Sequence, residues 1–299
     1  MQIALGALSF GSTVGERDSF ALLDRFVAAG GTLIDTANNY AYWIDGRTGD
    51  ESEQTVGAWL AARGNRDQVF LSTKAGARPD ASGEWEGLSA PVLAAAIEGS
   101  LRRLRTDHVD LYWAHVEDRS VPLEETLEAL DALHRQGRAV RLGASNHPAW
   151  RVERARALAT ARGWLPYSHV QLRHSYLRPR PGAALQEAGH RQASDETLDF
   201  VRDAGLTLWA YSTLLSGAYR DKPLPEVYEH PGTTARLKVL AEVAAEVDAT
   251  VNQVVLAWLG AQGIVPIVGV TKPEQLDEAM AATRLTLPEA LLARLDEPA

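Results

Sequence analysis

Four polar side chains stand at or just after the ends of short apolar runs in this chain of 299 residues. Asp35 ends the run TLID, Lys74 ends VFLSTK and His115 ends VDLYWAH, while Tyr40 follows Asp35 by five residues. If the runs are parallel strands of a closed barrel, their carboxyl ends meet at one mouth and the four side chains converge there. Each residue alone is also explained as an ordinary strand end or a solvent-facing group. Together they indicate a site, because a buried Lys and Asp are costly unless they pair.

This set of residue types predicts proton transfer to a developing alkoxide. A tyrosine has an ordinary pKa of about 10, and a nearby ammonium lowers that pKa by roughly 1–3 units because it favours the phenolate. Tyr40 would then be a general acid, with Asp35 holding Lys74 and with His115 orienting a carbonyl oxygen. Such a site reduces a carbonyl group once a hydride is supplied.

Other chemistries find little support in the composition. The absence of Cys excludes thiol nucleophiles, disulfides and cysteine-ligated metals, and no His-Glu-x-x-His occurs, so we expect no metal site. Gly6–Gly11 has the spacing of a phosphate loop, but Ser12 stands where its lysine belongs. The net charge of −9 argues against a nucleic-acid partner.

The sequence also predicts a cytoplasmic protein with no membrane partner. The N-terminus lacks a basic region followed by an apolar one, so we expect no signal peptide. No stretch approaches the roughly 18 uncharged apolar residues that a membrane span needs.

Eight short apolar runs alternate with amphipathic segments along the chain. The runs are 3–7, 32–34, 69–72, 109–114, 139–143, 168–172, 206–211 and 264–268. The helical segments are 18–29, 51–62, 89–105, 122–136, 147–162, 194–204, 233–248, 250–261, 273–281 and 288–296. This alternation predicts an α/β protein, a (β/α)8 TIM barrel forming a single domain over 1–299. A doubly wound open sheet is the alternative, although its Gly-rich first turn is missing.

Eight motifs carry a family resemblance, in order along the chain. They are LGALSFG (5–11), IDTANNY (34–40), LSTKAG (71–76), DLYWAH (110–115), LGASNH (142–147), VQLRHSYL (170–177), AYSTLLSG (210–217) and PIVGVTKPEQLDEA (266–279). With these motifs the chain resembles the aldo-keto reductase family. The resemblance implies a (β/α)8 barrel with a catalytic tetrad at Asp35, Tyr40, Lys74 and His115, the residues that the chemistry selects.

The resemblance further implies a nicotinamide cofactor. Ser145, Asn146 and Gln171 would hydrogen-bond its carboxamide, since they supply amide and hydroxyl partners. Tyr211 would stack on the nicotinamide ring, with a core aromatic as the other interpretation. The implied cofactor-binding set is Ala7, Leu8, Asp35, Ser145, Asn146, Gln171, Tyr211, Ser212, Thr213, Leu214, Leu215, Ser216, Gly217, Gly269, Thr271, Gln275 and Glu278, in which 212–217 would wrap the pyrophosphate.

The last motif reads as a helix start. Thr271 to Glu274 has the form of a capping box, and the free amides of that helix would attract a phosphate, although a cap alone also explains the pattern. NADP(H) is the default of the family. Gly269 and Gln275 stand where many members place Lys and Arg, so NAD(H) is not excluded.

The two ends of the chain and two single residues also depart from the pattern of the family. The chain starts almost at its first strand, so we expect the hairpin that usually covers the barrel bottom to be missing or truncated. Thr213 replaces a usual proline and Ala279 a common Asn. The chain ends soon after its last helix, which predicts an open substrate pocket.

Substrate identity is the least determined feature. Trp43, Trp85, Tyr176 and Tyr219 are candidates for the substrate pocket. The segment 173–191 holds four Arg and one Glu, which would suit an anionic substrate or form an ordinary solvated loop.

The sequence therefore predicts an NAD(P)H-dependent oxidoreductase that reduces an aldehyde or ketone to an alcohol. A Schiff-base aldolase using Lys74 is one alternative, but it leaves Tyr40 without a role. A cofactor-binding regulatory subunit is another, but nothing marks a docking surface. The oligomeric state is left open.

Overall fold

Eight parallel strands close into a barrel in the computed structural model, which describes residues 1–297 except 81, 184, 186, 188 and 221. The strands are β1 (Ala4–Gly6), β2 (Leu33–Asp35), β3 (Phe70–Ala75), β4 (Val109–Ala114), β5 (Ala139–Ser145), β6 (His169–Arg173), β7 (Thr207–Tyr211) and β8 (Val265–Gly269). Each strand pairs with its neighbours in sequence, and β1 also pairs with β8, which closes the ring. The predicted fold class and all eight predicted runs are confirmed.

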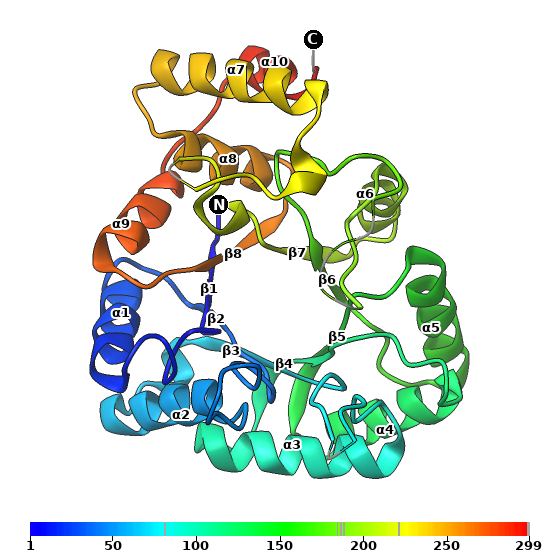
Figure 1. Ribbon diagram of the computed structural model, residues 1–299. Coiled ribbons are helices and arrows are strands. Elements are labelled where there is room, and N and C mark those ends of the chain that lie inside the picture. Colours follow the sequence, from blue (N-terminus) through cyan, green and yellow to red (C-terminus); the bar gives the residue numbers. More distant parts are fainter. Residues whose placement is uncertain (81, 184, 186, 188, 221, 298–299) are drawn as a thin grey trace.

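Ten helices surround the barrel in the described part of the chain (Figure 1). They are α1 (Glu16–Ala28), α2 (Glu51–Arg63), α3 (Ala90–Leu104), α4 (Leu123–Arg135), α5 (Ala149–Arg162), α6 (Asp195–Asp203), α7 (Pro231–Glu246), α8 (Val251–Ala261), α9 (Pro273–Ala282) and α10 (Glu289–Asp296). Each begins and ends within two residues of its predicted segment. α7 and α10 contact each other at one side of the barrel, outside the ring that the other helices form (Figure 1).

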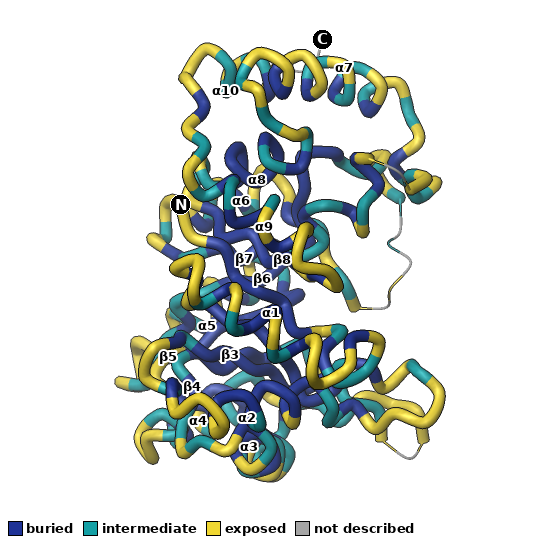
Figure 2. Tube along the Cα trace, turned by 90° about the vertical axis from the view of Figure 1, so that its left-hand side faces the viewer, coloured by how far each residue is buried: buried dark blue, intermediate teal, exposed yellow. Residues whose placement is uncertain are grey.

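The strands are buried on both of their faces, as continuous apolar runs predict (Figure 2). Their outward side chains pack against the helices in one large apolar cluster. Their inward side chains form a second cluster, made of Ala4, Leu33, Leu111, Trp113, Trp209, Val265 and Ile267, with Phe70 and Tyr211 packed against it. Inward positions therefore alternate with outward ones along each strand.

The inner cluster closes the end of the barrel where the strands begin. Phe70 starts β3 and His169 starts β6, and the ring of His169 lies edge-on to Trp113 at 6.1 Å. The rings of Trp113 and Trp209 are 5.7 Å apart at 66°, a favourable edge arrangement. We call Phe70, Trp113, His169 and Trp209 the floor of the barrel.

A glycine makes room for the floor. A Cβ added to Gly143 on β5 would lie 2.3 Å from Cε3 of Trp113, closer than any real contact. Gly143 is paired with Trp113 in the β4–β5 register. The indole therefore occupies space inside the barrel that any larger residue at position 143 would fill.

The start of α9 differs from its prediction. The N-cap is Lys272 rather than Thr271, and Glu274 does not cap. Instead Oε1 of Gln275 accepts hydrogen bonds from the backbone N–H groups of Thr271 at 2.8 Å and Lys272 at 3.2 Å. The capping-box prediction was therefore displaced by one residue, because a Gln at the third helical position reaches back as well as a Glu does.

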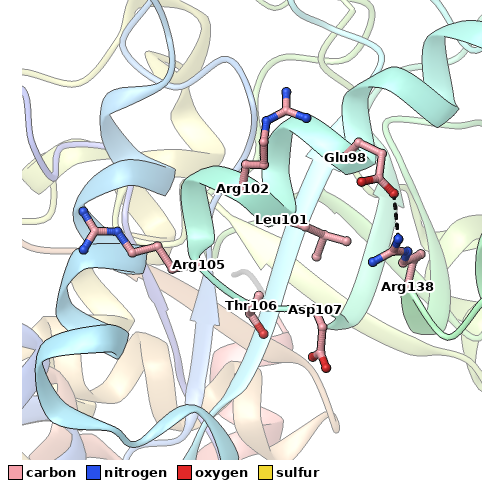
Figure 3. Close-up of a pocket in the computed structure, with 7 residues that line it drawn as sticks. All are labelled: Glu98, Leu101, Arg102, Arg105, Thr106, Asp107 and Arg138. Carbon is pink, nitrogen blue, oxygen red and sulfur yellow. Dashed lines mark ion pairs between the residues drawn. The ribbon is translucent and has the colours of Figure 1, made fainter.

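One surface cavity lies far from the carboxyl ends of the strands. It has a volume of about 600 Å³ and is bordered by Glu98, Leu101, Arg102, Arg105, Thr106, Asp107 and Arg138 (Figure 3). These residues belong to the outer end of α3 and to the segments that enter β4 and β5. The cavity therefore opens at the floor end of the barrel, away from Tyr40 and Lys74.

Candidate active site

Lys74 lies at the centre of the mouth of the barrel, by which we mean Asp35, Tyr40, Lys74 and His115. Its Nζ donates to Oδ2 of Asp35 at 2.5 Å, to the hydroxyl of Tyr40 at 2.6 Å and to the carbonyl of Thr36 at 2.8 Å. The side chain of Lys74 is completely buried. All three ammonium hydrogens are thus bonded, which compensates for the removal of the charge from water.

Asp35 is held from its other side as well. Oδ1 accepts from the hydroxyl of Ser72 at 2.8 Å and from Nε2 of Gln171 at 3.2 Å. The hydroxyl of Tyr40 lies 3.3 Å from Oδ2 of Asp35. The carboxylate is therefore fixed by side chains from β3, β6 and the loop after β2, and the expected pairing of Asp35 with Lys74 is present.

The pKa of Tyr40 moves opposite to the expectation from Lys74 alone. Burial and the Asp35 carboxylate raise the pKa of Tyr40 well above its ordinary value. Burial lowers the pKa of Lys74, and the Asp35 charge opposes that change. The depth of the site and the position of the Asp35 carboxylate cannot be read from the sequence. Their effect on the pKa of Tyr40 is larger than that of the Lys74 ammonium. The phenol is held in its protonated form.

His115 lies beside Tyr40, with the two rings 6.2 Å apart at 74°. Burial and the charge of Lys74 lower the pKa of His115 well below its ordinary value. The imidazole is therefore neutral at pH 7. A neutral imidazole offers one N–H donor.

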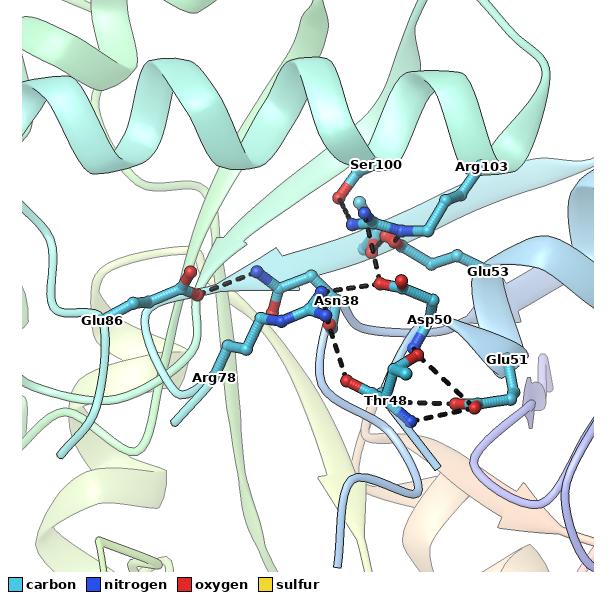
Figure 4. Close-up of polar contacts among 11 residues, drawn as sticks. Asn38, Thr48, Asp50, Glu51, Glu53, Arg78, Glu86, Ser100 and Arg103 are labelled. Carbon is cyan, nitrogen blue, oxygen red and sulfur yellow. Dashed lines mark hydrogen bonds and ion pairs between the residues drawn. The ribbon is translucent and has the colours of Figure 1, made fainter. Parts of the chain in front are cut away.

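Behind Lys74, a buried carboxylate that the sequence analysis missed supports β3 (Figure 4). Glu53 on α2 is fully buried, and its Oε1 accepts from the hydroxyl of Thr73 at 2.5 Å. Its Oε2 accepts from Nε of Arg103 at 2.6 Å, and Arg103 also pairs with Asp50 at 3.3 Å. The network anchors the residue that precedes Lys74. Glu53 stands among apolar positions of a helix, so only its depth distinguishes it from a surface Glu.

Ser145, Asn146 and Gln171 meet at the ends of β5 and β6, and all three are buried. Asn146 is already hydrogen-bonded within the protein. Its Nδ2 donates to the carbonyl of His115 and to the hydroxyl of Ser145, each at 3.1 Å, and its Oδ1 accepts from the hydroxyl of Tyr211 at 2.7 Å. Asn146 has a left-handed backbone with φ 58°. The expected residues are thus together, with Asn146 as their link to Tyr211.

Tyr211 is half-buried at the end of β7, and the loop that follows has an unusual backbone. Left-handed φ angles occur at Ser212 (55°), Leu215 (46°), Ser216 (55°) and Gly217 (98°). Non-glycine residues rarely adopt this conformation, and strain of this kind clusters at ligand sites. Thr213 and Leu214 lie in the same loop, where the Thr213 hydroxyl donates to the carbonyl of Ile267 at 3.2 Å.

Most of the residues after β1 and β8 that the sequence assigns to cofactor binding are exposed. Leu8, Gly269, Thr271 and Gln275 are exposed, and a Cβ added to Gly269 would meet no described heavy atom within 4 Å. Ala7 is buried. Free space therefore lies beside the ends of these two strands.

Glu278 is engaged with the protein rather than free. Its Oε1 accepts from the Thr250 hydroxyl at 2.7 Å and from Arg220 at 3.4 Å, and its Oε2 accepts from Asn252 at 3.2 Å. This carboxylate ties α9 to the start of α8 and to the loop after β7.

The four expected substrate-pocket residues fall into two pairs. Trp43 and Trp85 are exposed, at 53% and 38% of their surface, in the loops after β2 and β3. Tyr176 and Tyr219 are buried, and the Tyr219 hydroxyl bonds to Ser175 at 2.6 Å and to the backbone N–H of Leu177 at 2.8 Å. These two are core side chains, so they are not part of the pocket that we propose below.

The Arg-rich segment 173–191 carries less free charge than its composition indicates. Each of its four arginines pairs with a carboxylate: Arg173 with Glu187 at 2.6 Å, Arg178 with Asp195 at 2.7 Å, Arg180 with Glu226 at 3.5 Å and Arg191 with Glu117 at 3.3 Å. Three of the four partners lie outside the segment. The local positive charge is therefore neutralised, which removes the support for an anionic substrate.

Two features are absent from the described residues. No group of three or more His, Cys, Asp or Glu side chains is arranged to hold a metal ion. Within the same residues, no helix is long and apolar enough to cross a membrane.

The barrel and its mouth agree with comparisons to known proteins. The sequence profile of the Aldo/keto reductase family matches residues 2–299, so the chain belongs to this family. It is 30% identical to the uncharacterized oxidoreductase YrpG of Bacillus subtilis (strain 168), covering 99% of this chain and 91% of that one. It is 31% identical to an aryl-alcohol dehydrogenase of Pestalotiopsis microspora, with 95% and 75% covered.

A solved structure extends the likeness to three dimensions. The thermostable aldo-keto reductase Tm1743, crystallised with the inhibitor epalrestat, superimposes with a TM-score of 0.78 at 27% identity. The match covers 98% of this chain and 93% of that one. Family and fold thus support an oxidoreductase, as the sequence predicts.

Proposed function

We propose that the protein reduces an aldehyde or ketone to an alcohol with a nicotinamide cofactor, using Tyr40 as the proton donor. The observation that carries this proposal is the position of Lys74, whose Nζ contacts both the Tyr40 hydroxyl at 2.6 Å and the Asp35 carboxylate at 2.5 Å. A lysine in that position stabilises negative charge on the phenolic oxygen as the proton leaves. The raised pKa of Tyr40 keeps the phenol protonated until then.

Each member of the mouth has a part in this reaction. The neutral imidazole of His115 would donate a hydrogen bond to the carbonyl oxygen and orient it toward Tyr40. Tyr40 gives its proton to that oxygen as the carbonyl carbon becomes tetrahedral. Lys74 holds the phenolic oxygen, and Asp35 holds Lys74.

The residues beside the mouth fit a dinucleotide. Left-handed residues at 215–217 make the loop after β7 turn tightly, and the N–H groups of Leu215 and Gly217 are bonded to the carbonyls of Ser212 at 3.1 Å and Leu214 at 2.9 Å. The hydroxyls of Ser212 and Ser216 would then contact the pyrophosphate. Tyr211 would face the nicotinamide ring, Ser145 and Gln171 would contact its carboxamide, and open space beside Gly269 leads to the start of α9. When bound in its reduced form, the cofactor supplies the hydride.

We propose NADP(H) as the cofactor on the basis of family membership, together with Lys272 at the exposed start of α9. Because the N–H groups of Thr271 and Lys272 are bonded to Gln275, the attraction for an extra phosphate comes from the Lys272 ammonium and the dipole of α9. Parallel titrations with NADPH and NADH, followed by tryptophan fluorescence, measure the preference directly. Equal affinities would contradict it.

The central test is Tyr40→Phe, which removes the hydroxyl and keeps the ring. We expect kcat to fall by about 10²–10⁴-fold, the usual contribution of a general acid, while the cofactor still quenches tryptophan fluorescence. Tyr167→Phe is the matched control, because the Tyr167 hydroxyl is also buried but lies outside the mouth and has no hydrogen-bond partner among the described residues. Full turnover by Tyr40→Phe would refute the assignment.

Two other measurements distinguish the aldolase and the regulatory subunit from the reductase. A Schiff-base aldolase needs a lysine amine that is free to attack the substrate. Nζ of Lys74 instead donates hydrogen bonds to Asp35, Thr36 and Tyr40. A borohydride-trapped adduct on Lys74 would nevertheless establish Schiff-base chemistry. Cofactor binding by the unmodified protein without turnover of any carbonyl compound would indicate a regulatory subunit.

A further inference from the structure

The loop after β3 and the loop after β6 touch each other. Trp85 lies in the loop between β3 and α3, and Gly189 lies in the loop between β6 and α6. A Cβ added to Gly189 would lie 2.4 Å from Cη2 of Trp85 and 3.4 Å from Cγ1 of Val116. Since β4 and β5 separate β3 from β6 in the ring, the contact lies on the side of the barrel where His115 and Asn146 follow those strands. We call Trp85 and Gly189–Arg191 the arch.

Residues Gly189–Arg191 of the arch are hydrogen-bonded to residues at the ends of β5 and β6 and in the loop after β4. The backbone N–H of Arg191 donates to Oδ1 of Asn146 at 3.1 Å, and its guanidinium pairs with Glu117 at 3.3 Å. The carbonyl of Arg191 accepts from the N–H of Arg173, the last residue of β6, at 2.9 Å. These bonds place residues 189–191 relative to β5 and β6.

The Trp85 side is fixed as well. Trp85 pairs with Pro79 in an antiparallel bridge. The next residue, Glu86, accepts hydrogen bonds from Nδ2 of Asn38 at 2.8 Å and from the N–H of Gly76 at 2.7 Å (Figure 4). The indole is thus presented from a short loop anchored next to β2 and β3.

His190 is the polar side chain that the arch brings to the reaction space. Its ring lies 5.1 Å from that of Tyr211 at 63°. Its Nδ1 is buried without a hydrogen-bond partner in the described part of the chain, and a carboxylate oxygen of Glu187 lies 3.8 Å from it. Burial lowers the pKa of His190, so the imidazole is neutral at pH 7. Tyr40 thus lies beside His115 and Tyr211 beside His190. Of these four rings, only that of His190 has no role yet.

Large apolar side chains are exposed in the loops that follow the first three strands. Leu8, Trp43 and Trp85 are exposed at 43%, 53% and 38% in the loops after β1, β2 and β3. The arginines of segment 173–191 are paired with carboxylates, as described above. A mouth of this kind favours a flat apolar substrate over an anion.

We propose that His190 is a specificity-determining residue of this site. Its imidazole hydrogen-bonds a second, neutral oxygen of the substrate, while Trp85 packs against the flat body of the molecule. The preferred substrates are then uncharged aromatic aldehydes or ketones that carry a hydroxyl or a further carbonyl group. This inference rests on the proposed reductase function.

The test compares meta-hydroxybenzaldehyde with meta-methylbenzaldehyde, which has a similar shape but no hydrogen-bonding group. The ratio of their kcat/KM values is measured for the unmodified protein and for His190→Phe, which keeps a ring against Tyr211. We expect the variant to lose a preference of about 5–10-fold for the hydroxyl compound, mainly through KM, as for one neutral hydrogen bond. An unchanged ratio would overturn the role of His190.

Two further measurements test the arch and the substrate class. Trp85→Ala is expected to raise KM for both aromatic aldehydes, whereas Trp150→Ala, which removes an equally large exposed indole stacked on Arg119, leaves it unchanged. Equal effects of the two variants would contradict the arch. A lower KM for meta-carboxybenzaldehyde than for its neutral relatives would contradict the preference for uncharged substrates.

A binding experiment separates this inference from the proposed function. Calorimetric titration of cofactor-loaded Tyr40→Phe measures the Kd of each aldehyde without turnover. Loss of the hydroxyl preference in Tyr40→Phe/His190→Phe supports the inference even if the protein proves inactive as a reductase. The same preference in both variants would overturn it.

Discussion

On β3, Phe70 packs against apolar rings in the floor, and four residues later Lys74 holds a buried charge in the mouth. On β7, Trp209 belongs to the floor, while Tyr211, the next inward residue, bonds to Asn146. Two inward positions are only about 7 Å apart along a strand. On a single strand, a residue of the apolar floor and a residue of the polar site are thus separated by only one or two inward positions.

The two regions satisfy their side chains by different means. The floor relies on ring contacts and contains few polar groups, and Arg141 covers its outer side over Phe70 at 5.4 Å. The mouth relies on hydrogen bonds around Lys74, and strained backbone follows it after β7. The comparison leads us to expect that floor substitutions change stability and that mouth substitutions change catalysis.

The largest expected effect comes from breaking the charge pair of the mouth. Lys74→Met should lower kcat by about 10²–10⁴-fold and the free energy of unfolding by about 3–5 kcal/mol, because Asp35 is left buried without a partner. Asp35→Asn/Lys74→Met should recover most of the stability but none of the activity. Steady-state kinetics and urea denaturation measure the two effects. A double variant as unstable as Lys74→Met would show that the lost stability does not come from the unpaired charge.

A floor substitution should give the opposite pattern. Trp113→Ala removes a fully buried indole, so we expect the free energy of unfolding to fall by about 3–5 kcal/mol. The kcat of the folded variant should change far less than in the Lys74 variant. A comparable loss of kcat would show that the floor positions the catalytic residues.

Gly143 supplies a matched partner for that experiment. Gly143→Ala alone should destabilise by about 1–3 kcal/mol through overpacking against Trp113. In the Trp113→Ala background the added methyl group enters the cavity, so its cost should fall or reverse. Additive effects in denaturation experiments would contradict the close contact between the two positions.

The smallest expected effect is a change in the pH dependence of stability. Burial lowers the pKa of His169 to about 4, so the unfolded chain binds a proton between about pH 6.5 and 4 that the folded chain does not. Stability therefore falls as the pH falls through this range. His169→Phe should reduce the difference in melting temperature between about pH 7 and about pH 4.5. An unchanged difference would mean that His169 does not contribute.

The sequence predicts the mouth well because each of its residues ends an apolar run or follows one closely. Asp35, Lys74 and His115 can be located by counting, and once parallel strands are assumed their convergence follows from geometry. The pKa direction of Tyr40 could not be predicted, since it depends on the depth of the site and on the exact position of Asp35.

Features that depend on distant pairs are invisible in the sequence. The contact between Trp85 and Gly189 requires the barrel to close, and the pairing of Arg191 with Glu117 joins separate loops. For the same reason the composition of segment 173–191 could not decide between a binding site for anions and an ordinary solvated loop. Glu53 was missed because its partners, Thr73 and Arg103, lie on other elements.

Oδ1 of Asn146 accepts hydrogen bonds from both the Tyr211 hydroxyl and the backbone N–H of Arg191. A single side chain thus connects the ring at the end of β7 to the arch. A ligand that displaces or fixes Tyr211 therefore changes the hydrogen bond between Oδ1 of Asn146 and the backbone N–H of Arg191. Thermodynamic linkage then makes the effect reciprocal: whatever factor such a ligand applies to binding under the arch, a molecule under the arch applies to that ligand. The affinities of the two ligands are then coupled through one shared amide oxygen, equally in both directions.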